Sequence, residues 1–187
     1  CAAAAALSVQ AHAEDAKVLR MACESTYAPF VFFDSETGKL KGFEIDLLEY
    51  VAKEMGRKLE VTNMGFDAII PSMLTGITDV GASAFTITPE RAKRVLFSKP
   101  YYISGLSILV RAEDKDKIKS VKDIENCTIC AQIGTSGSMR AAKVPGAKVR
   151  NFNTINDAYL ELGNKGCKAV ITDRPVTAYF LAARPET

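Results

Sequence analysis

Residues 59–91, LEVTNMGFDAIIPSMLTGITDVGASAFTITPER, decide the fold class of this 187-residue chain. A short apolar strand is predicted at residues 59–62, followed by a helix at 67–74 and a second strand at 79–84. Thr88-Pro89 then supplies an N-cap and the first position of another helix. Such alternation predicts a mostly parallel sheet with right-handed crossovers, whose ligands bind beyond the carboxyl ends of its strands.

The same alternation continues on both sides of this stretch. Strands are predicted at residues 18–23, 105–110, 128–132, 148–152 and 168–172, and helices at 43–55, 121–124, after 138, at 155–162 and after 173. The chain therefore predicts an α/β fold of two lobes, each a mostly parallel sheet flanked by helices. Lobe 1 is expected at residues 14–106 and lobe 2 at 107–187. Because lobe 2 ends in a helix without a return strand, we expect the C-terminal part of the fold to be missing.

Composition and charge exclude several classes of function. The chain has 24 Lys and Arg against 22 Asp and Glu, and the dispersed charges give no footprint for nucleic acid. Its longest apolar run, residues 1–9, is about half of the roughly 20 residues that a membrane-spanning helix needs. The single histidine, His12, lies in a predicted leader, which excludes His-dependent hydrolases and His-based zinc sites in the mature chain. We expect no metal and no cofactor.

Residues 1–13, CAAAAALSVQAHA, have the features of the end of a secretory signal peptide. The small apolar residues end in Ala11-His12-Ala13, an A-x-A cleavage site, and acidic residues follow at once. The alternative is a lipoprotein in which Cys1 is acylated and the Ala-rich stretch forms a tether. Both interpretations place the protein outside the cytoplasm, in the periplasm, where disulfides can form.

Four cysteines remain after the leader, and three full pairings are possible among Cys23, Cys127, Cys130 and Cys167. The Cys127-x-x-Cys130 spacing has no second pair and no histidine to complete a zinc site, and positions three apart on a strand face opposite sides. Cys23 and Cys130 are expected to be buried strand residues. Cys127 and Cys167 each precede a predicted parallel strand, so we expect these two to form the disulfide.

Seven short stretches stand in a characteristic order and spacing. They are YAPF (27–30), GFEIDL (42–47), FDAIIP (66–71), TITPER (86–91), FSKPYY (97–102), QIGT (132–135) and DRP (173–175). Together they resemble the periplasmic polar-amino-acid-binding proteins of ABC importers, the type II solute-binding fold of family 3. The resemblance covers residues 18–183. It implies a receptor that binds a free L-amino acid between two lobes and delivers it to a membrane permease.

The resemblance also implies a binding site. A free amino acid carries a carboxylate and an ammonium, so its receptor needs a fixed cation and a fixed anion. Arg91 is expected to bind the carboxylate, Asp173 the ammonium, and Tyr27 and Phe66 to stack on the ligand side chain. The expected site residues are Glu24, Tyr27, Phe66, Ser83, Ala84, Thr86, Arg91, Gln132, Thr135, Ser136 and Asp173. Each has a plainer alternative: a solvated helix charge for Arg91, an N-cap for Asp173, and core packing for the aromatic residues.

Glu24 is expected to set the ligand class. It stands where the family usually carries an acidic residue facing the ligand side chain, so it favours hydrogen-bond donors and opposes Glu or Asp. Cationic Arg, Lys or His, or the amide of Gln, would fit. With Asp173, Glu24 gives two negative charges against one on Arg91, which favours a cationic ligand. The alternative for Glu24 is a surface carboxylate at a strand end.

Two other classes of protein remain open. One is an enzyme on the same scaffold, similar to the cyclohexadienyl or prephenate dehydratases, in which Asp173 or Glu24 would act as a general acid. The other is the sensory domain of a membrane receptor. The loop at residues 133–137 lacks the Gly-Lys-Ser/Thr ending of a phosphate loop, so nucleotide binding is not expected. The protein is expected to be a monomeric binding protein with no nucleic-acid partner.

Overall fold

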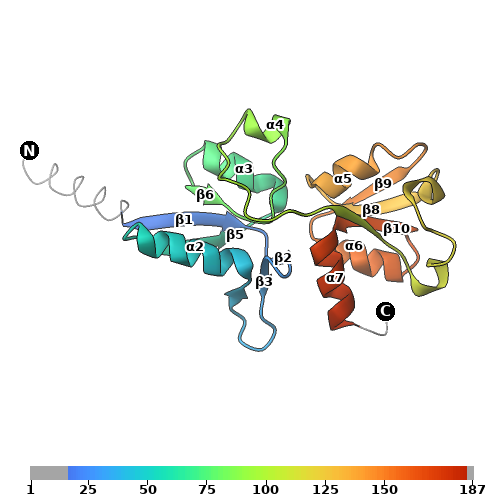
Figure 1. Cartoon of the computed structure of the whole chain (residues 1–187), viewed down its shortest axis with the longest axis horizontal. Helices are drawn as coiled ribbons and strands as arrows, with labels where there is room; N and C mark the ends of the chain where they lie inside the picture. Colours follow the sequence, from blue (N-terminus) through green and yellow to red (C-terminus); the bar gives the residue numbers. More distant parts are fainter. Residues whose placement is uncertain (1–16, 185–187) are drawn as a thin grey trace, which may run out of the picture.

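A computed structural model of the chain describes residues 17–184 and shows two α/β lobes side by side (Figure 1). In the first lobe, β1 (Val18–Cys23), β5 (Lys58–Asn63) and β6 (Val80–Gly81) form a parallel sheet in the order β5-β1-β6. Helices α2 (Phe43–Glu54) and α3 (Phe66–Leu74) pack on this sheet. The predicted strands and helices of this lobe are therefore confirmed, although β6 is shorter than the predicted strand at 79–84.

The second lobe has a four-stranded sheet in the order β7-β10-β8-β9. Its strands are β7 (Leu106–Leu109), β8 (Thr128–Gln132), β9 (Lys148–Phe152) and β10 (Ala169–Asp173), and its helices are α5 (Ser136–Ala141), α6 (Ile155–Gly163) and α7 (Arg174–Ala183). Strands β8, β9 and β10 are parallel, whereas β7 pairs antiparallel with β10. The short helix predicted at 121–124 is the 3₁₀ turn η2 (Val121–Ile124), which follows another such turn, η1 (Ala112–Asp114). The predicted boundary between residues 106 and 107 stays a prediction.

A small antiparallel sheet lies beside the first lobe, and the sequence did not predict it. Its strands are β2 (Thr26–Tyr27), β3 (Val31–Phe33) and β4 (Leu40–Lys41). Phe32, on β3, contacts the ring of Tyr179 on α7 at 5.7 Å between centroids, so this sheet reaches the second lobe. Gly42 follows β4 and begins α2 with φ 128°, and a Cβ there would lie 2.2 Å from the carbonyl oxygen of Phe30. Only glycine fits this close approach.

The apolar interior is divided among the lobes and their junction. One cluster fills the first lobe around Met21, Val31 and Ile45, and another covers one face of the second sheet around Ile129 and Ile171. A third cluster covers the other face of the second sheet and also includes Tyr27 and Phe30 of the first lobe. The two lobes are thus in apolar contact. The chain crosses between them once within residues 17–184, through the extended segment between α4 (Pro89–Ala92) and β7 (Figure 1).

The predicted disulfide between Cys127 and Cys167 is wrong. The structure joins Cys130 to Cys167, with their Cα atoms 6.0 Å apart, and leaves Cys127 free. Cys127 precedes β8 and belongs to neither apolar cluster of the second lobe, whereas Cys130, within β8, lies in the cluster on the face opposite to Ile129. Cys167 precedes β10, and its side chain belongs to the same cluster as Cys130.

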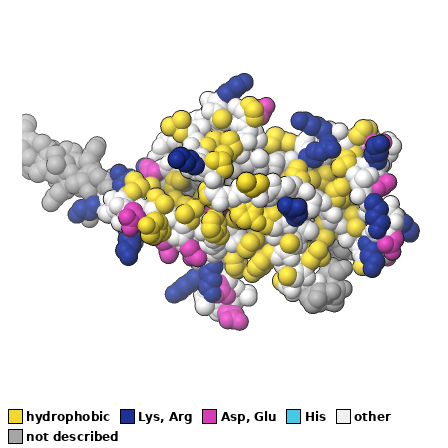
Figure 2. All heavy atoms as spheres, viewed as in Figure 1, with side chains coloured by type: hydrophobic (Ala, Val, Ile, Leu, Met, Phe, Trp, Pro, Cys, Tyr) yellow, Lys and Arg dark blue, Asp and Glu magenta, His cyan; other side chains and the backbone are white. Residues whose placement is uncertain are grey.

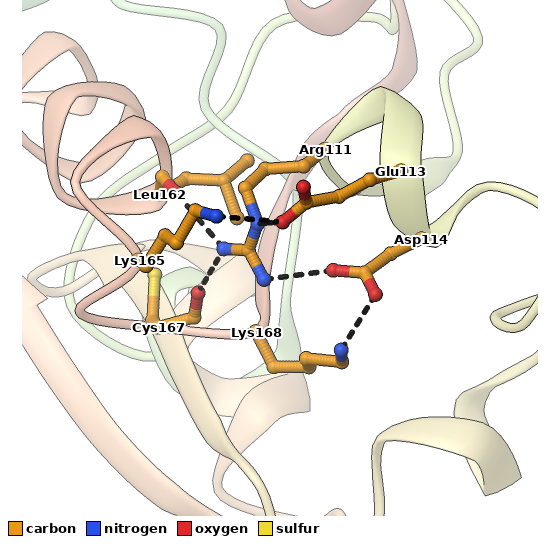
Figure 3. Close-up of polar contacts among 7 residues, drawn as sticks. All are labelled: Arg111, Glu113, Asp114, Leu162, Lys165, Cys167 and Lys168. Atoms are coloured by element: carbon orange, nitrogen blue, oxygen red, sulfur yellow. Dashed lines mark hydrogen bonds and ion pairs between the residues drawn. The ribbon is translucent and has the colours of Figure 1, made fainter.

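An ionic cluster holds the segment that carries Cys167 (Figure 3). Arg111 donates to the carbonyl oxygens of Cys167, at 2.8 Å, and Leu162, at 3.0 Å, and its guanidinium also contacts Asp114 at 2.7 Å. Asp114 is 4% exposed and accepts from Lys168 at 2.7 Å. A second carboxylate, Glu113, lies within 3.2 Å of the guanidinium. These contacts fix the path of the backbone just before β10.

The surface carries both charged and apolar side chains. In Figure 2 hydrophobic side chains gather over the middle of one face, and most Lys and Arg side chains stand nearer its outline. Leu96 and Ile103, both between α4 and β7, are 99% and 92% exposed. Among residues 17–184, no helix combines the length and apolar character needed to span a membrane. The predicted signal-peptide remnant at residues 1–13 lies outside the described residues.

Candidate functional site

Arg91 provides a buried cation at the junction of the lobes. It lies on the four-residue helix α4, where the Thr88 side chain caps the backbone N–H of Arg91 at 3.2 Å. The guanidinium donates to the carbonyl oxygen of Thr86 at 2.8 Å and, across the junction, to that of Gly134 at 2.9 Å. It also lies over the rings of Phe66 and Phe85, 5.3 and 5.1 Å from their centroids. Burial lowers the pKa of Arg91, and the charge of Asp173 opposes this effect.

The loop before α5 brings two more expected residues to the same place. Thr135 caps α5 by accepting from the backbone N–H of Ser138 at 3.2 Å, and its hydroxyl donates to the carbonyl oxygen of Gln132. The hydroxyl of Thr86, on the first lobe, donates to that of Ser136 at 3.1 Å. Arg91, Thr86 and the loop at 134–136 are therefore joined across the junction.

Asp173 provides a buried anion on the opposite lobe. It ends β10 and stands at the N-cap of α7, but its side chain makes no capping bond. Instead Oδ2 accepts from the hydroxyl of Tyr27 at 2.5 Å, and this hydroxyl lies 3.0 Å from that of Thr172. Burial raises the pKa of Asp173, while the Tyr27 hydrogen bond and the charge of Arg91 act in the other direction. The carboxylate is placed to attract a cation entering the junction.

Glu24 and Gln132 form a second polar pair across the junction. Both are almost fully buried, and Gln132 Nε2 donates to Glu24 Oε2 at 2.9 Å. Glu24 also accepts from the backbone N–H and the hydroxyl of Thr26, at 3.1 and 2.9 Å. Burial raises the pKa of Glu24. The side-chain oxygen of Gln132, Oε1, is buried without a hydrogen-bond partner among the described residues.

Ser83 and Ala84 follow β6 at the carboxyl end of the first sheet. Ser83 is 1% exposed, and its hydroxyl exchanges hydrogen bonds with the backbone N–H and carbonyl of Glu24, at 3.3 and 3.2 Å. Ala84 adopts a left-handed φ of 50°. Its backbone N–H donates to both oxygens of the Glu44 carboxylate. Both residues were expected inside the strand predicted at 79–84, but they follow the shorter β6.

A cavity of about 600 Å³ opens at this junction. Four of the expected residues line it, namely Ala84, Thr86, Ser136 and Asp173. The rest of its wall comes mainly from α3 and β6 of the first lobe and from the segment between α4 and β7. The other expected residues are not part of this lining: Glu24, Tyr27, Phe66, Ser83, Arg91, Gln132 and Thr135. The structure thus brings the predicted set together, but with Tyr27 paired to Asp173 and Glu24 paired to Gln132.

Two residues at the site were not predicted. Glu44 is fully buried and contacts Ala84, and Tyr101, which lines the cavity, donates to Glu44. Both occur in stretches quoted for the resemblance, GFEIDL and FSKPYY, and this was the only sequence signal that marked them. No cluster of His, Cys, Asp or Glu suited to a metal ion occurs within residues 17–184.

Residues 19–179 match the family model of the bacterial extracellular solute-binding proteins, family 3. The chain belongs to this family. It is 33% identical over 168 residues to a probable histidine-binding protein of Campylobacter jejuni, covering 90% of this chain and 64% of that one. It is 29% identical to the ABC transporter arginine-binding protein 1 of Escherichia coli, covering 93% of this chain and 70% of that one.

Solved structures give the same result. The arginine-bound, truncated ArgBP of T. maritima superposes with a TM-score of 0.88 at 36% identity, covering 93% of this chain and 82% of that one. An ancestral amino-acid-binding protein, a precursor of cyclohexadienyl dehydratase, gives a TM-score of 0.86 at 39% identity. The match covers 90% of this chain and 75% of that one.

These comparisons confirm the predicted family and the two-lobed α/β fold class. The family and the named relatives are described as binding proteins, in agreement with the expectation of a binding protein. The chain spans 64% and 66% of the length of two curated relatives and 59% of a third, so it corresponds to about two thirds of a typical relative.

Proposed function

We propose that this protein is an extracytoplasmic receptor that binds a free polar amino acid between its lobes and delivers it to the permease of an ABC importer. The observation that carries the proposal is the pair of opposite buried charges at the junction, Arg91 on the first lobe and Asp173 on the second. Each matches one charge of an amino-acid backbone. A ligand held by both lobes would favour the closed arrangement.

Arg91 has the donors for a carboxylate. A guanidinium has five N–H donors in a planar fork, and two of them are used by the carbonyl oxygens of Thr86 and Gly134. The remaining donors can form charge-assisted hydrogen bonds with the α-carboxylate. The hydroxyls of Thr86 and Ser136 lie next to this guanidinium and line the cavity. They add donors on the side from which a ligand would enter.

The side-chain end of the site offers acceptors. Glu24 carries a carboxylate, and the buried Oε1 of Gln132 has no partner among the described residues. This chemistry favours a ligand side chain that donates hydrogen bonds: the cation of arginine, lysine or histidine, or the amide of glutamine. Two negative charges, on Glu24 and Asp173, against one positive charge on Arg91 favour the cationic ligands. Relatives named for histidine and arginine support the same class.

A ligand panel tests the proposal. The exported protein is titrated by calorimetry with the twenty amino acids and with prephenate. We expect binding of cationic amino acids or glutamine, and no turnover of prephenate. Binding of none of the amino acids would overturn the proposal, and conversion of prephenate would favour the dehydratase alternative instead.

The Glu24→Gln variant tests the ligand class separately. Glutamine keeps the size of the side chain but removes its charge, so the preference for arginine and lysine over glutamine should weaken. The exchange Gln132→Glu is the reciprocal variant, because it adds a charge at the same contact. If L-glutamate binds the wild type best, or if Glu24→Gln leaves the ranking unchanged, the assignment of Glu24 to ligand selection is wrong.

The setting of the protein follows from the same proposal. Export to the periplasm through the signal remnant, or anchoring through an acylated Cys1, would place the receptor beside its permease. We propose that it acts there as a monomer. Family membership among extracellular solute-binding proteins supports this location.

A further inference from the structure

Glu44 is a fully buried carboxylate to which the proposed ligand contacts assign no role. It lies in the first turn of α2, where its backbone N–H donates to the carbonyl oxygen of Phe30 at 3.0 Å. The positive end of the helix dipole favours a negative charge at this position. The side chain points away from α2, toward the loop that follows β6.

The carboxylate binds two donors from different parts of the first lobe. The N–H of Ala84 lies 2.9 Å from both Oε1 and Oε2, and the hydroxyl of Tyr101 donates to Oε1. Tyr101 belongs to the segment that crosses between the lobes. Burial raises the pKa of Glu44, and the hydrogen bonds from Tyr101 and Ala84 act against this rise. Glu44 thus links α2, the loop after β6 and the crossing segment.

Ala84 holds a backbone conformation that needs support. Its φ of 50° lies in the left-handed region, which is unfavourable for a non-glycine residue. A hydrogen bond to a charged group is stronger than one between neutral groups and can offset this cost. Ala84 lies between Ser83 and Thr86, and the carbonyl oxygen of Thr86 accepts from Arg91. The conformation of Ala84 therefore contributes to the path of the chain toward Thr86, and through Thr86 to the position of the Arg91 guanidinium.

We propose that Glu44 is a positioning residue for the amino-acid site. By fixing the N–H of Ala84 it holds the loop at 83–86 in the conformation that presents Thr86 to the cavity and to Arg91. This inference rests on the proposed function, because it assigns Glu44 to the same ligand site. Glu44 itself does not line the cavity, so it acts through Ala84.

Glutamine cannot replace Glu44 at this contact. Because both carboxylate oxygens lie 2.9 Å from the Ala84 nitrogen, an amide in either orientation places its NH₂ group against the Ala84 N–H. Two donors would then face each other, and the loop must move to separate them. The Glu44→Gln variant keeps the volume of the side chain, so it disturbs the loop without leaving a cavity.

The experiment compares Glu44→Gln with a matched control, Asp114→Asn. Asp114 is also a buried carboxylate, but it contacts Arg111 and Lys168 in the second lobe, away from the cavity. Affinity for L-arginine and L-histidine is measured by calorimetry, and unfolding by urea, for both variants and the wild type. We expect Glu44→Gln to weaken binding at least about tenfold, the factor that corresponds to one lost charge-assisted hydrogen bond. Asp114→Asn should lower stability and leave affinity unchanged.

The outcomes separate this inference from the proposed function. If the wild type binds neither the two probes nor any other amino acid, the proposed function fails. If the wild type binds and Glu44→Gln binds equally well, the positioning role of Glu44 is wrong. Equal losses of affinity in Glu44→Gln and Asp114→Asn would also overturn it, since both would then act through stability alone.

Amide hydrogen exchange in the wild type gives a test that needs no variant. Ala84 lies outside every helix and strand, so its N–H would exchange quickly unless the Glu44 carboxylate holds it. We expect its exchange to be at least about tenfold slower than that of an unstructured amide. Exchange of the Ala84 N–H at the rate of an unstructured amide would overturn the inference. This measurement remains decisive even if the Glu44→Gln variant does not fold.

Discussion

The hydroxyl of Tyr27 on β2 lies 2.5 Å from Oδ2 of Asp173 at the end of β10, and this hydrogen bond joins the two lobes. Tyr27 is 3% exposed, and burial together with the Asp173 charge raises its pKa well above the usual range. A neutral phenol thus occupies the acceptor that the proposed function gives to the ligand ammonium. The ligand and Tyr27 would compete for the same oxygen.

Tyr27→Phe should lower stability while sparing affinity. The variant keeps the buried ring but removes a hydrogen bond to a charged group, which costs about 1.5–3 kcal/mol of unfolding free energy. Affinity for L-arginine should stay equal or increase, because Asp173 loses its competing donor. Urea unfolding and calorimetry measure the two quantities, and Tyr50→Phe, at a position 63% exposed, is the control. Weaker binding with unchanged stability would instead give the Tyr27 hydroxyl a direct contact with the ligand.

Arg91→Ala should abolish amino-acid binding and leave the fold intact. Truncating one partner of a desolvated charge pair costs roughly 2–5 kcal/mol, whereas micromolar affinity corresponds to only about 8 kcal/mol. Arg91→Lys should also bind poorly, since one ammonium cannot reach Thr86, Gly134 and a ligand carboxylate in the same geometry. Arg94→Ala, on the exposed side of the same segment, is the control. Calorimetry that finds unchanged affinity in folded Arg91→Ala would remove the carboxylate assignment.

Stability and affinity should respond to pH in opposite directions. Burial raises the pKa values of Glu24, Glu44 and Asp173, so the folded state binds more protons than the unfolded state between the ordinary and the raised values. Their contribution to stability is present below the ordinary values and is lost as pH rises through the raised ones. The ligand-free protein should therefore gain stability on mild acidification from neutral pH, whereas affinity for L-arginine should fall as Glu24 and Asp173 become neutral.

Thermal unfolding and calorimetry across this pH range measure both trends. At lower pH the stability of the ligand-free protein should decrease again. Hydrogen bonds and ion pairs lower the pKa of Asp79 and Asp114, and the stabilisation from these contacts is lost as pH falls below about 3.8. The Glu24→Gln variant should show a smaller change of both stability and affinity with pH in mild acid, because it lacks one of the titrating carboxylates. A parallel decrease of stability and affinity from neutral pH would contradict the prediction.

Arg111→Ala should change which cysteines pair. Continued as a regular strand, β10 would place Cys167 in register with Cys127 and on the same face of the sheet, since Ala169 pairs with Ile129. Arg111 donates to the Cys167 carbonyl, and we expect this contact to hold the backbone away from that path. After refolding with glutathione disulfide as oxidant, peptide mapping should find only the bond between Cys130 and Cys167 in the wild type. The variant should show a share of bonds between Cys127 and Cys167.

Arg140→Ala is the control for this exchange, because Arg140 is an exposed arginine of the same lobe. It should keep the wild-type pairing. An Arg111→Ala protein that also keeps only the bond between Cys130 and Cys167 would show that the ionic cluster does not select the pairing.

The elements with a strong sequence signal were predicted closely. Strands β8 and β9 have the predicted bounds. Strands β2, β3 and β4 have two or three residues each, too few to show a period of two. Strand β6 ends before Ala84, whose left-handed φ the sequence does not reveal. Local pattern thus defined the long elements, and contacts between distant segments defined the short ones.

The candidate site was likewise predicted only in part. The motifs marked Arg91, Asp173 and the loop at 134–136, which the structure brings to one junction. They did not show that Glu24 would pair with Gln132, because that contact joins residues 108 positions apart. The disulfide was mispredicted because Cys127 and Cys167 both lie just outside the regular strands, where alternation no longer determines the face of a side chain.

The bond from Tyr27 to Asp173 also has a spectroscopic consequence. The chain contains six tyrosines and no tryptophan, so its intrinsic emission comes from phenols alone. Hydrogen bonding to a carboxylate quenches phenol emission, and Tyr27 and Tyr101 both donate to buried carboxylates. A ligand that displaces Tyr27 from Asp173 would release part of this quenching. Movement of the two lobes can therefore be followed by ultraviolet fluorescence in the unlabelled protein, without adding a dye or a new residue.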